Sequence, residues 1–487
     1  MQIDLVAPRG EQLRRRTVLR SAVHVASAVV GGALMSACAG LSAPAPESIA
    51  EKVILIWSPW RVGWGSGWEA LFYEATAPFR AAHPGVDIRV DVSTGTGSGN
   101  YTGVAAQIIA GSGPDVYSGF TPTPMIEGGY NLNLLPYLKL HAVDTTLFDA
   151  GQYAKYVSES GEVFALPAEL STSAVPVNLG VLDALGLPYP DPEWTYQQAA
   201  TLWSATTVRS TAPGKRRYGF QFWGQKARGL PGDYYLRGWG ASAAMRNYSA
   251  HCGLSTPEAL TFAQWWYPLV VDGVMMQGGS PLTFTNQQSV SGFAGSWQLP
   301  TYAGLRSFKW DFWPQPRWPT GTSSYAGNDY YAVNANTRHP TEAAAFIVWL
   351  TTSTDWQRAM MRLQLVIPPT RPFWAEWVDF VRSVAPPLAS KRLEAFMVAP
   401  MAGRAFNHPA FAYDSNDAYA VIGTYTSQIV AGKLDAVAGF REAARAVDAF
   451  ETAARTQTPP PSLNARIAAE SALRKRVAAM LAAGASR

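Results

Sequence analysis

Tryptophan is the residue type of this sequence whose chemistry most directly points to a ligand. The chain of 487 residues contains 18 Trp, and aromatic residues make up 12% of it. An indole ring is costly to place on an exposed surface, but it stacks well against a sugar ring or another flat apolar face. The composition therefore favours a binding site that is lined by aromatic side chains.

Catalytic and metal-binding motifs are missing from the sequence. It contains no G-x-S-x-G, no Walker-type G-K-[ST] and no H-E-x-x-H segment. A glycosidase needs two positioned carboxylates, and no such pair stands out among the acidic residues. The histidines beyond residue 37 are too far apart in sequence for a helical metal site; they are His83, His141, His251, His339 and His408. We therefore predict a protein that is not an enzyme and that needs no cofactor and no metal.

The N-terminal segment, residues 1–37, is predicted to be a signal peptide. Basic residues precede an apolar run from Ala22 to Met35, and this run is too short to span a bilayer comfortably. The segment that contains Arg15 and Arg16 (RRTVLR) resembles the twin-arginine export motif. A basic segment that serves the general export route remains the alternative.

A lipid anchor is predicted directly after this signal. Residues 35–38 (MSAC) resemble a bacterial lipobox, in which the cysteine becomes the lipidated first residue of the mature protein. Cys38 stands at the end of the apolar run, and this position favours lipidation over an ordinary cleavage site. Residues 38–51 have the polar, Pro-containing composition of a tether. The other cysteine is Cys252, so we expect no intramolecular disulfide.

The body of the chain alternates between strand and helix patterns, which predicts an α/β fold. Residues 53–57 are a continuous apolar run typical of a buried parallel strand, and residues 86–92 alternate as a second strand. Between them, the spacing predicts one helix that begins near Trp68 and is stopped by His83-Pro84-Gly85, with an apolar face over 68–79 that includes Leu71. Further strands are predicted at 115–117, 163–167, 309–312 and 330–333, and further helices from Thr195 and over 340–350. Ligands of such doubly wound sheets bind beyond the carboxyl ends of the strands.

Short segments in a fixed order carry a resemblance to a known family. They are ILIWS at 54–58, FRAAHPG at 79–85, GSGPDV at 111–116, GEVFALP at 161–167, the helix and loop from Asn178 to Pro190, GSW at 295–297, GNDYYAV at 327–333 and His339-Pro340. In this order, from Val53 to Phe450, they resemble the extracellular solute-binding proteins of ABC transporters. The similarity is to the sugar-binding group, which includes maltose-binding protein.

The resemblance implies a periplasmic-binding-protein-like fold of two α/β lobes, with discontinuous lobes and a hinge. We place lobe one at 52–167 plus 329–372 and lobe two at 170–326 plus 375–455. A C-terminal helical extension is expected at 456–487. A ligand that binds in the cleft between such lobes closes them about the hinge.

Two candidate ligand-binding residues come with a specific chemistry. Glu169 follows the hinge strand and matches an acidic residue that bonds sugar hydroxyls in the family, since one carboxylate accepts several O–H donors. Trp297 matches a tryptophan that stacks on sugar in several relatives, and packing within its lobe is the alternative. At the second crossover the chain departs from the family's G-x-G-W pattern, so the resemblance does not identify the ligand.

The remaining candidates are placed by strand ends and by order along the chain. Trp57 and Trp60 end the first strand, and Trp57 is equally well explained as a core residue. The others follow the strand at 115–117, stand at the second crossover or are placed by order alone: Ser118, Phe120, Thr121, Asn328, Asp329, Tyr330, Asp233 and Trp239.

The resemblance implies that this chain is the lipid-anchored binding protein of an ABC importer. It would be exported to the outer face of the cell membrane. Its expected partners are a small carbohydrate ligand and the permease subunits, and we expect a monomer. The net charge of +4 includes the arginines of the signal peptide, so the composition predicts no binding of nucleic acid.

Two alternatives to a sugar receptor stay open. One is capture of a ferric ion or another small solute, because iron-binding proteins of this fold use adjacent tyrosines. Tyr234-Tyr235 and Tyr330-Tyr331 are such pairs. The other alternative is an exported carbohydrate-active enzyme.

Overall fold

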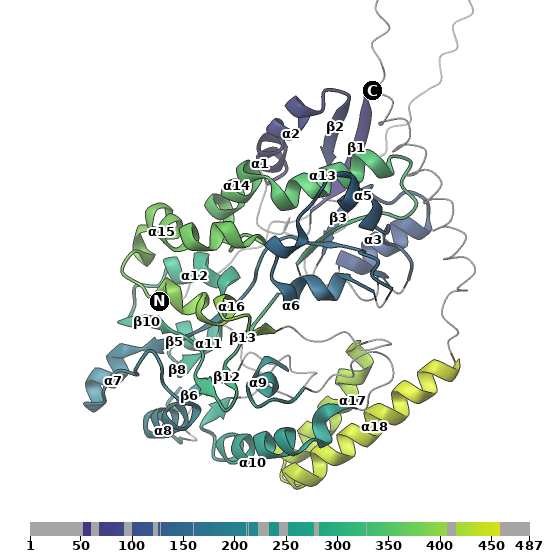
Figure 1. Ribbon diagram of the computed structural model, residues 1–487. Helices are drawn as coiled ribbons and strands as arrows, with labels where there is room; N and C mark the ends of the chain where they lie inside the picture. Colours follow the sequence, from purple (N-terminus) through teal and green to yellow (C-terminus); the bar gives the residue numbers. More distant parts are fainter. Residues whose placement is uncertain are drawn as a thin grey trace, which may run out of the picture. The chain divides into compact units, whose positions relative to one another are not determined.

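The computed structural model (Figure 1) describes residues 52–59, 68–91, 100–119, 125–126, 128–158, 160–210, 212, 214–222, 233–242, 252–276, 282–327, 329–406 and 415–457. The predicted signal peptide at 1–37, the tether at 38–51 and residues 458–487 of the predicted extension lie outside the described residues. No helix within the described ranges combines the length and the apolar character that a membrane crossing requires.

The first sheet has five strands in the order β2-β1-β3-β14-β4. Strand β1 runs parallel to β2 and β3, whereas β14 runs antiparallel to β3 and β4. Leu55 and Trp57 of β1 are buried, as expected for an apolar run in the middle of a sheet. The strands are β1 (Val53–Ser58), β2 (Val86–Val90), β3 (Val116–Gly119), β4 (Leu166–Pro167) and β14 (Tyr330–Val333).

Helices cover this sheet and complete its core. Trp57 lies against the rings of Phe72, Phe346 and Trp356, at centroid distances of 5.2, 5.4 and 5.5 Å. Helix α13 carries Pro340 in its first turn and buries Phe346, as predicted. The helices in this part of the fold are α1 (Trp68–Ala75), α2 (Ala77–Ala82), α3 (Asn100–Ile109), α5 (Leu135–Leu140), α6 (Ala150–Tyr153), α13 (Pro340–Thr352) and α14 (Thr354–Gln364).

The single helix predicted over 68–79 is wrong, because two helices meet at Thr76. Pro78 lacks the backbone N–H that a continuous helix would need for its bond to the preceding turn. The Thr76 hydroxyl instead donates to the carbonyl oxygen of Phe72 at 3.0 Å. Leu71, predicted on the apolar face, is 39% exposed.

The second sheet has six strands in the order β10-β5-β8-β6-β7, with β9 paired to β5. Strand β6 runs parallel to β7 and β8, whereas β5 runs antiparallel to β8, β9 and β10. Strand β10 begins one residue later than predicted. The strands are β5 (Ser173–Asn178), β6 (Tyr218–Gln221), β7 (Met275–Met276), β8 (Ser289–Gly292), β9 (Ala294–Gly295) and β10 (Trp310–Trp313).

Helix α8, which packs on the second sheet, begins where the sequence predicts. Thr195 is its N-cap and forms a capping box with Gln198, with bonds of 2.8 and 3.3 Å. Trp203 of this helix packs on Phe220 of β6 at a centroid distance of 4.3 Å. Helices α17 and α18 pack against each other and on α10 (Figure 1). The helices in this part of the fold are α7 (Leu179–Leu185), α8 (Tyr196–Thr206), α9 (Asp233–Gly238), α10 (Pro257–Val271), α11 (Leu282–Thr285), α12 (Leu299–Ala303), α17 (Ser415–Val430) and α18 (Ala436–Gln457).

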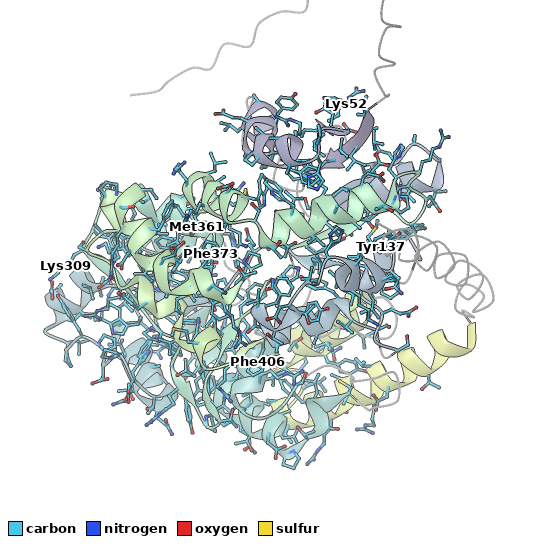
Figure 2. The ribbon with its side chains drawn as sticks, turned by 45° about the horizontal axis from the view of Figure 1, so that its top comes forward. Lys52, Tyr137, Lys309, Met361, Phe373 and Phe406 are labelled. Atoms are coloured by element: carbon cyan, nitrogen blue, oxygen red, sulfur yellow. The ribbon has the colours of Figure 1, made fainter. Side chains whose placement is uncertain are left out.

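A third apolar core forms where the chain after α14 meets the second sheet. Leu365 belongs to one buried cluster with Phe312 of β10 and Trp377 of α15 (Trp374–Val384). Met361 lies in the same cluster and Phe373 packs against it; both are labelled in Figure 2. The segment after α14 is therefore held by side chains of the second sheet.

The chain passes between the two sheets more than once. It leaves the first sheet after β4, enters the second at β5 and returns from β13 (Ser324–Tyr325) to β14. Each sheet therefore draws on segments that are far apart in sequence, and the predicted two-lobed α/β fold with discontinuous lobes is confirmed. The residue bounds of each lobe stay a prediction.

We expect Thr195→Ala to destabilise the protein by about 0.5–2 kcal/mol, because it removes the side-chain acceptor at the N-terminus of α8. Gln197→Ala, at an exposed position of the same helix, is the control and should change stability less. Urea unfolding followed by circular dichroism measures both variants. An equal loss of stability in the two would mean that the capping box contributes nothing to the start of α8.

Candidate functional site

Residues 168–172, which join β4 to β5, form a buried crossover segment between the sheets. Residues 169–172 are each at most 4% exposed. A buried backbone has to hydrogen-bond its polar groups within the protein, and this segment bonds to three other parts of the chain. The bonds are Ala168 N to Asp329 O (2.9 Å), Leu170 N to Ile367 O (2.9 Å), Gly327 N to Ser171 O (2.6 Å) and Ser296 N to Thr172 O (2.8 Å).

Two carboxylates meet at the crossover segment through one serine. The Ser171 hydroxyl oxygen lies 2.7 Å from Oε1 of Glu169 and 3.1 Å from Oδ2 of Asp329, and both acids are 4% exposed. A hydroxyl has one proton, so Ser171 donates to one carboxylate at a time. A carboxylate group accepts several O–H donors, and O–H donors are what a polyhydroxyl ligand offers. Glu169 and Asp329, both predicted site residues, are thus brought together.

Gly327 lets the outgoing and returning segments approach this closely. A Cβ atom at position 327 would overlap the Cβ of Ser171 and lie 2.8 Å from its hydroxyl oxygen, so only glycine fits. From α6, Nε2 of Gln152 donates to the backbone oxygens of Glu169 at 2.5 Å and of Gly327 at 3.4 Å. Asp149 accepts the backbone N–H of Gln152 at the start of α6, and burial raises the pKa of Asp149 above its usual value.

Buried hydroxyl groups hold the start of β5 next to the crossover segment. The Ser324 hydroxyl oxygen lies 2.7 Å from that of Thr172 and accepts the backbone N–H of Ser173 at 2.9 Å. The Gln315 amide donates to the Ser173 hydroxyl at 3.3 Å. All four side chains are buried, so hydrogen bonds join β5 to β13 at this place.

Trp297 is a predicted site residue that lies next to the crossover segment. Its neighbour Ser296 donates its N–H to the Thr172 oxygen at 2.8 Å and accepts the Thr172 N–H on its hydroxyl at 3.1 Å. The indole lies 5.8 Å from the Phe293 ring and 5.6 Å from the Tyr325 ring. Trp297 is half-buried. A partly exposed indole near hydrogen-bond acceptors suits a sugar, which has an apolar C–H face and polar hydroxyls.

Three other predicted site residues are packed into cores. Trp57 is 1% exposed and lies among the aromatic rings described above. Tyr330 is 0% exposed and lies over Gly119, where a Cβ atom would be 2.7 Å from the Tyr330 hydroxyl. Trp239 is 7% exposed and its ring is 4.9 Å from that of Tyr196. Packing accounts for these three side chains, and a role in binding stays a prediction.

The remaining predicted residues are described in part or not at all. Ser118 is 6% exposed in β3 and pairs with Tyr331 of β14. Asp233 is the first residue of α9, but its side chain lies outside the described residues. The other predicted positions outside them are Trp60, Phe120, Thr121, Asn328 and Cys38.

Most of the tryptophans lie in apolar cores. This corrects the inference from composition that the many tryptophans line a ligand site. The sequence has 18 tryptophans, and among those whose side chains the structure describes the buried ones are Trp57, Trp194, Trp203, Trp239, Trp266, Trp310, Trp313, Trp318, Trp356, Trp374 and Trp377. A large ring gains more free energy from burial than a smaller side chain. The high Trp content therefore reflects core packing more than ligand recognition.

The tyrosine pairs considered for a ferric ion are buried. Tyr234 and Tyr235 are at most 1% exposed, and Tyr331 is 4% exposed. Burial raises the pKa of Tyr234, Tyr235 and Tyr330 above the usual range, which opposes the phenolate form that binds iron. In the part of the chain that the structure describes, no group of three or more His, Cys, Asp or Glu is arranged to hold a metal ion.

Three residues at the crossover are not singled out by the sequence patterns: Ser171, Gln152 and Tyr325. A signal for Ser171 is present, because residues 169–173 (ELSTS) place four polar residues in a segment expected to join the lobes. Gln152 and Tyr325 carry no such signal. Their positions depend on how distant segments meet.

Comparison with known families gives one match. Residues 58–355 match the family described as bacterial extracellular solute-binding protein. No curated protein is similar enough in sequence to give a match.

Solved structures of similar fold extend over most of the chain. The cyclic alpha-maltosyl-1,6-maltose binding protein from Arthrobacter globiformis is 18% identical, with a TM-score of 0.67 over 82% of this chain and 99% of that chain. An ABC substrate-binding protein from Listeria monocytogenes in complex with cycloalternan is 16% identical, with a TM-score of 0.66 over the same shares. The sugar-binding protein MalE from Xanthomonas citri is 15% identical, with a TM-score of 0.64 over 84% and 100%.

We expect Gly327→Ala to destabilise the fold by about 1–3 kcal/mol, because the added methyl group overlaps Ser171. Ser171→Gly removes the atoms that it would meet. The double variant should therefore lose less stability than the sum of the two single variants. Thermal unfolding of the four proteins gives this comparison. Additive losses would mean that residues 171 and 327 are not in close contact.

Proposed function

Since the chain belongs to the bacterial extracellular solute-binding protein family, we propose that it is the sugar- or oligosaccharide-binding component of an ABC importer. It captures its ligand in a cleft between the two lobes and delivers it to the permease. The family supplies the role of a solute receptor. The class of ligand is inferred from the residues at the crossover.

The observation that carries this proposal is the arrangement around Ser171. Two buried carboxylates, Glu169 and Asp329, share the Ser171 hydroxyl, and a carboxylate is a group that accepts several O–H donors. Partly exposed Trp297 is joined to the same segment through Ser296 and Thr172. Carboxylate acceptors together with an indole ring match the hydroxyls and the C–H face of a sugar.

The structural neighbours support a carbohydrate ligand over an ion. The proteins from Arthrobacter globiformis and Listeria monocytogenes are described with cyclic oligosaccharides, and the Xanthomonas citri protein is described as sugar-binding. Their identities of 15–18% carry no information about which sugar this chain binds. We propose a neutral sugar, because the acceptor oxygens of two carboxylates suit O–H donors.

Further contacts to the ligand are proposed from residues on the strand ends and crossovers. In the sequence, Trp60 comes after β1, Phe120 and Thr121 come after β3, and Asn328 comes before β14. For Trp57, Tyr330, Ser118, Trp239 and Asp233 a contact with ligand remains our proposal from the sequence. The lobe bounds, 52–167 plus 329–372 and 170–326 plus 375–455, are proposed on the same basis.

We propose that the receptor is held at the outer face of the membrane by a lipid on Cys38. Residues 1–37 would direct export, with Arg15 and Arg16 favouring the twin-arginine route. Residues 38–51 would then link the lipid to the folded body, which begins at β1. A monomer is sufficient for this role.

We expect at least one neutral di- or trisaccharide, from a panel that includes maltotriose and mannotriose, to bind with measurable heat by titration calorimetry. Glu169→Gln should weaken that binding by about 1–3 kcal/mol, because it removes charge-assisted hydrogen bonds. Glu193→Gln, at an exposed position, is the matched control and should bind like the wild type. Binding of ferric citrate but of no sugar would contradict the proposal. Equal affinities in the two variants would exclude a ligand contact by Glu169.

We expect Cys38→Ala to release the protein from the membrane fraction, because the thiol that would carry the lipid is gone. Cell fractionation followed by immunoblotting measures the distribution. Cys252→Ala is the control, since Cys252 is the other cysteine of the chain and is buried. Membrane retention of the Cys38→Ala protein at the wild-type level would contradict lipid anchoring at this position.

A further inference from the structure

The Trp297 ring lies folded back over Gly295, two residues before it in the chain. A Cβ atom built on Gly295 would overlap Cη2 and Cζ2 of the indole and lie 2.5 Å from its Cζ3. All three atoms belong to the six-membered ring, so the outer edge of the indole covers the Gly295 backbone. Any side chain at position 295 would have to displace the indole. The atoms that its Cβ would meet belong to a rigid ring and not to the end of a flexible side chain.

The backbone on both sides of the ring is fixed by hydrogen bonds. The Gly295 N–H donates to Oε1 of Gln298 at 2.8 Å. Ser296 makes the two bonds to Thr172 described above, and Gly295 pairs with Ser173 in the second sheet. A methyl group at position 295 therefore cannot be relieved by a small backbone shift, since such a shift would break bonds to the crossover segment.

Aromatic rings limit the other directions in which the indole could turn. The Phe293 ring lies 5.8 Å away at an interplanar angle of 48°, and the Tyr325 ring lies 5.6 Å away at 67°. Both neighbours are buried, whereas Trp297 is half-buried. The half-buried indole is thus limited to one orientation by Gly295 and by these two rings.

We infer that Gly295 is a positioning residue for ligand recognition: its missing side chain sets the plane in which Trp297 meets a sugar ring. This inference rests on the proposed function, because that function supplies the sugar on which Trp297 stacks. Stacking requires the indole face to lie parallel to the C–H face of the ligand, so a displaced ring loses most of the contact. Gly295 itself touches no ligand and acts only through Trp297.

The ring position can be tested without any ligand. Protein labelled with 5-fluorotryptophan gives fluorine NMR resonances, and the resonance lost in Trp297→Ala belongs to Trp297. Gly295→Ala should shift this resonance and leave those of distant tryptophans in place. Gly85→Ala is the control, because a Cβ atom at position 85 would meet no atom within 4 Å. An unshifted Trp297 resonance in Gly295→Ala would overturn the inference, whatever the wild type binds.

The effect on recognition is tested with a double-mutant cycle, using maltotriose and mannotriose as probes. Gly295→Ala should weaken binding by about tenfold or more in the wild-type background, on the scale of a lost aromatic contact. In the Trp297→Ala background it should change affinity less than about twofold, since the ring it would displace is absent. Equal weakening in both backgrounds, or wild-type affinity in Gly295→Ala, would overturn the positioning role.

The cycle separates failure of this inference from failure of the proposed function. If wild-type protein binds no carbohydrate, the proposed sugar receptor fails, and with it the role of the ring in stacking. If wild-type protein binds sugar and Trp297→Ala weakens it, the proposed function stands and only the behaviour of Gly295→Ala decides the inference. Thermal unfolding of each variant confirms that affinities are compared between folded proteins.

Discussion

A chain that crosses between two sheets through the protein interior has to satisfy its backbone hydrogen bonds on the way. Residues 168–172 do this by bonding to Asp329, Ile367, Gly327 and Ser296, which come from three separate parts of the sequence. Leaving one such buried group unpaired costs about 1–3 kcal/mol. The crossing therefore dictates where the returning segment, the chain after α14 and the end of β9 have to lie.

The polar character of the site follows from this crossing. A buried backbone leaves room only for small side chains where segments touch, as Gly327 against Ser171 illustrates. The hydroxyl of Ser171 then becomes the shared donor for Glu169 and Asp329. The same bonds that make the fold continuous between the lobes thus bring two carboxylates together.

Aromatic side chains divide into two roles in this protein. Trp57 and Trp203 are each at most 1% exposed and join helices to sheets through ring packing. Trp297 differs because it is half-buried and because its neighbour Ser296 hydrogen-bonds to the crossover segment. Burial of the ring edge on Gly295 gives it a fixed orientation without burying it completely. Exposure and restraint, rather than residue type, set Trp297 apart from the core rings and make it the ring that we propose for ligand recognition.

Local patterns in the sequence predicted several of the elements and the α/β class, and the resemblance to a family implied the two lobes. The capping box at Thr195, Pro340 at the start of α13 and the apolar run of β1 depend on neighbours within a few residues, so the sequence alone predicts them. The break at Thr76 was predictable in the same way, because Pro78 removes one backbone donor. The sequence also pointed to Glu169 and Asp329, which adjoin segments expected to join the lobes. It pointed to Trp297 through the resemblance to the family, in which a matching tryptophan stacks on sugar. Only the tertiary structure decided that Ser171 links the two acids, that Trp57 and Tyr330 pack in cores, and that Gly295 supports Trp297. These contacts join residues whose positions depend on how the two sheets meet. No spacing along one strand or helix encodes the distances between such residues.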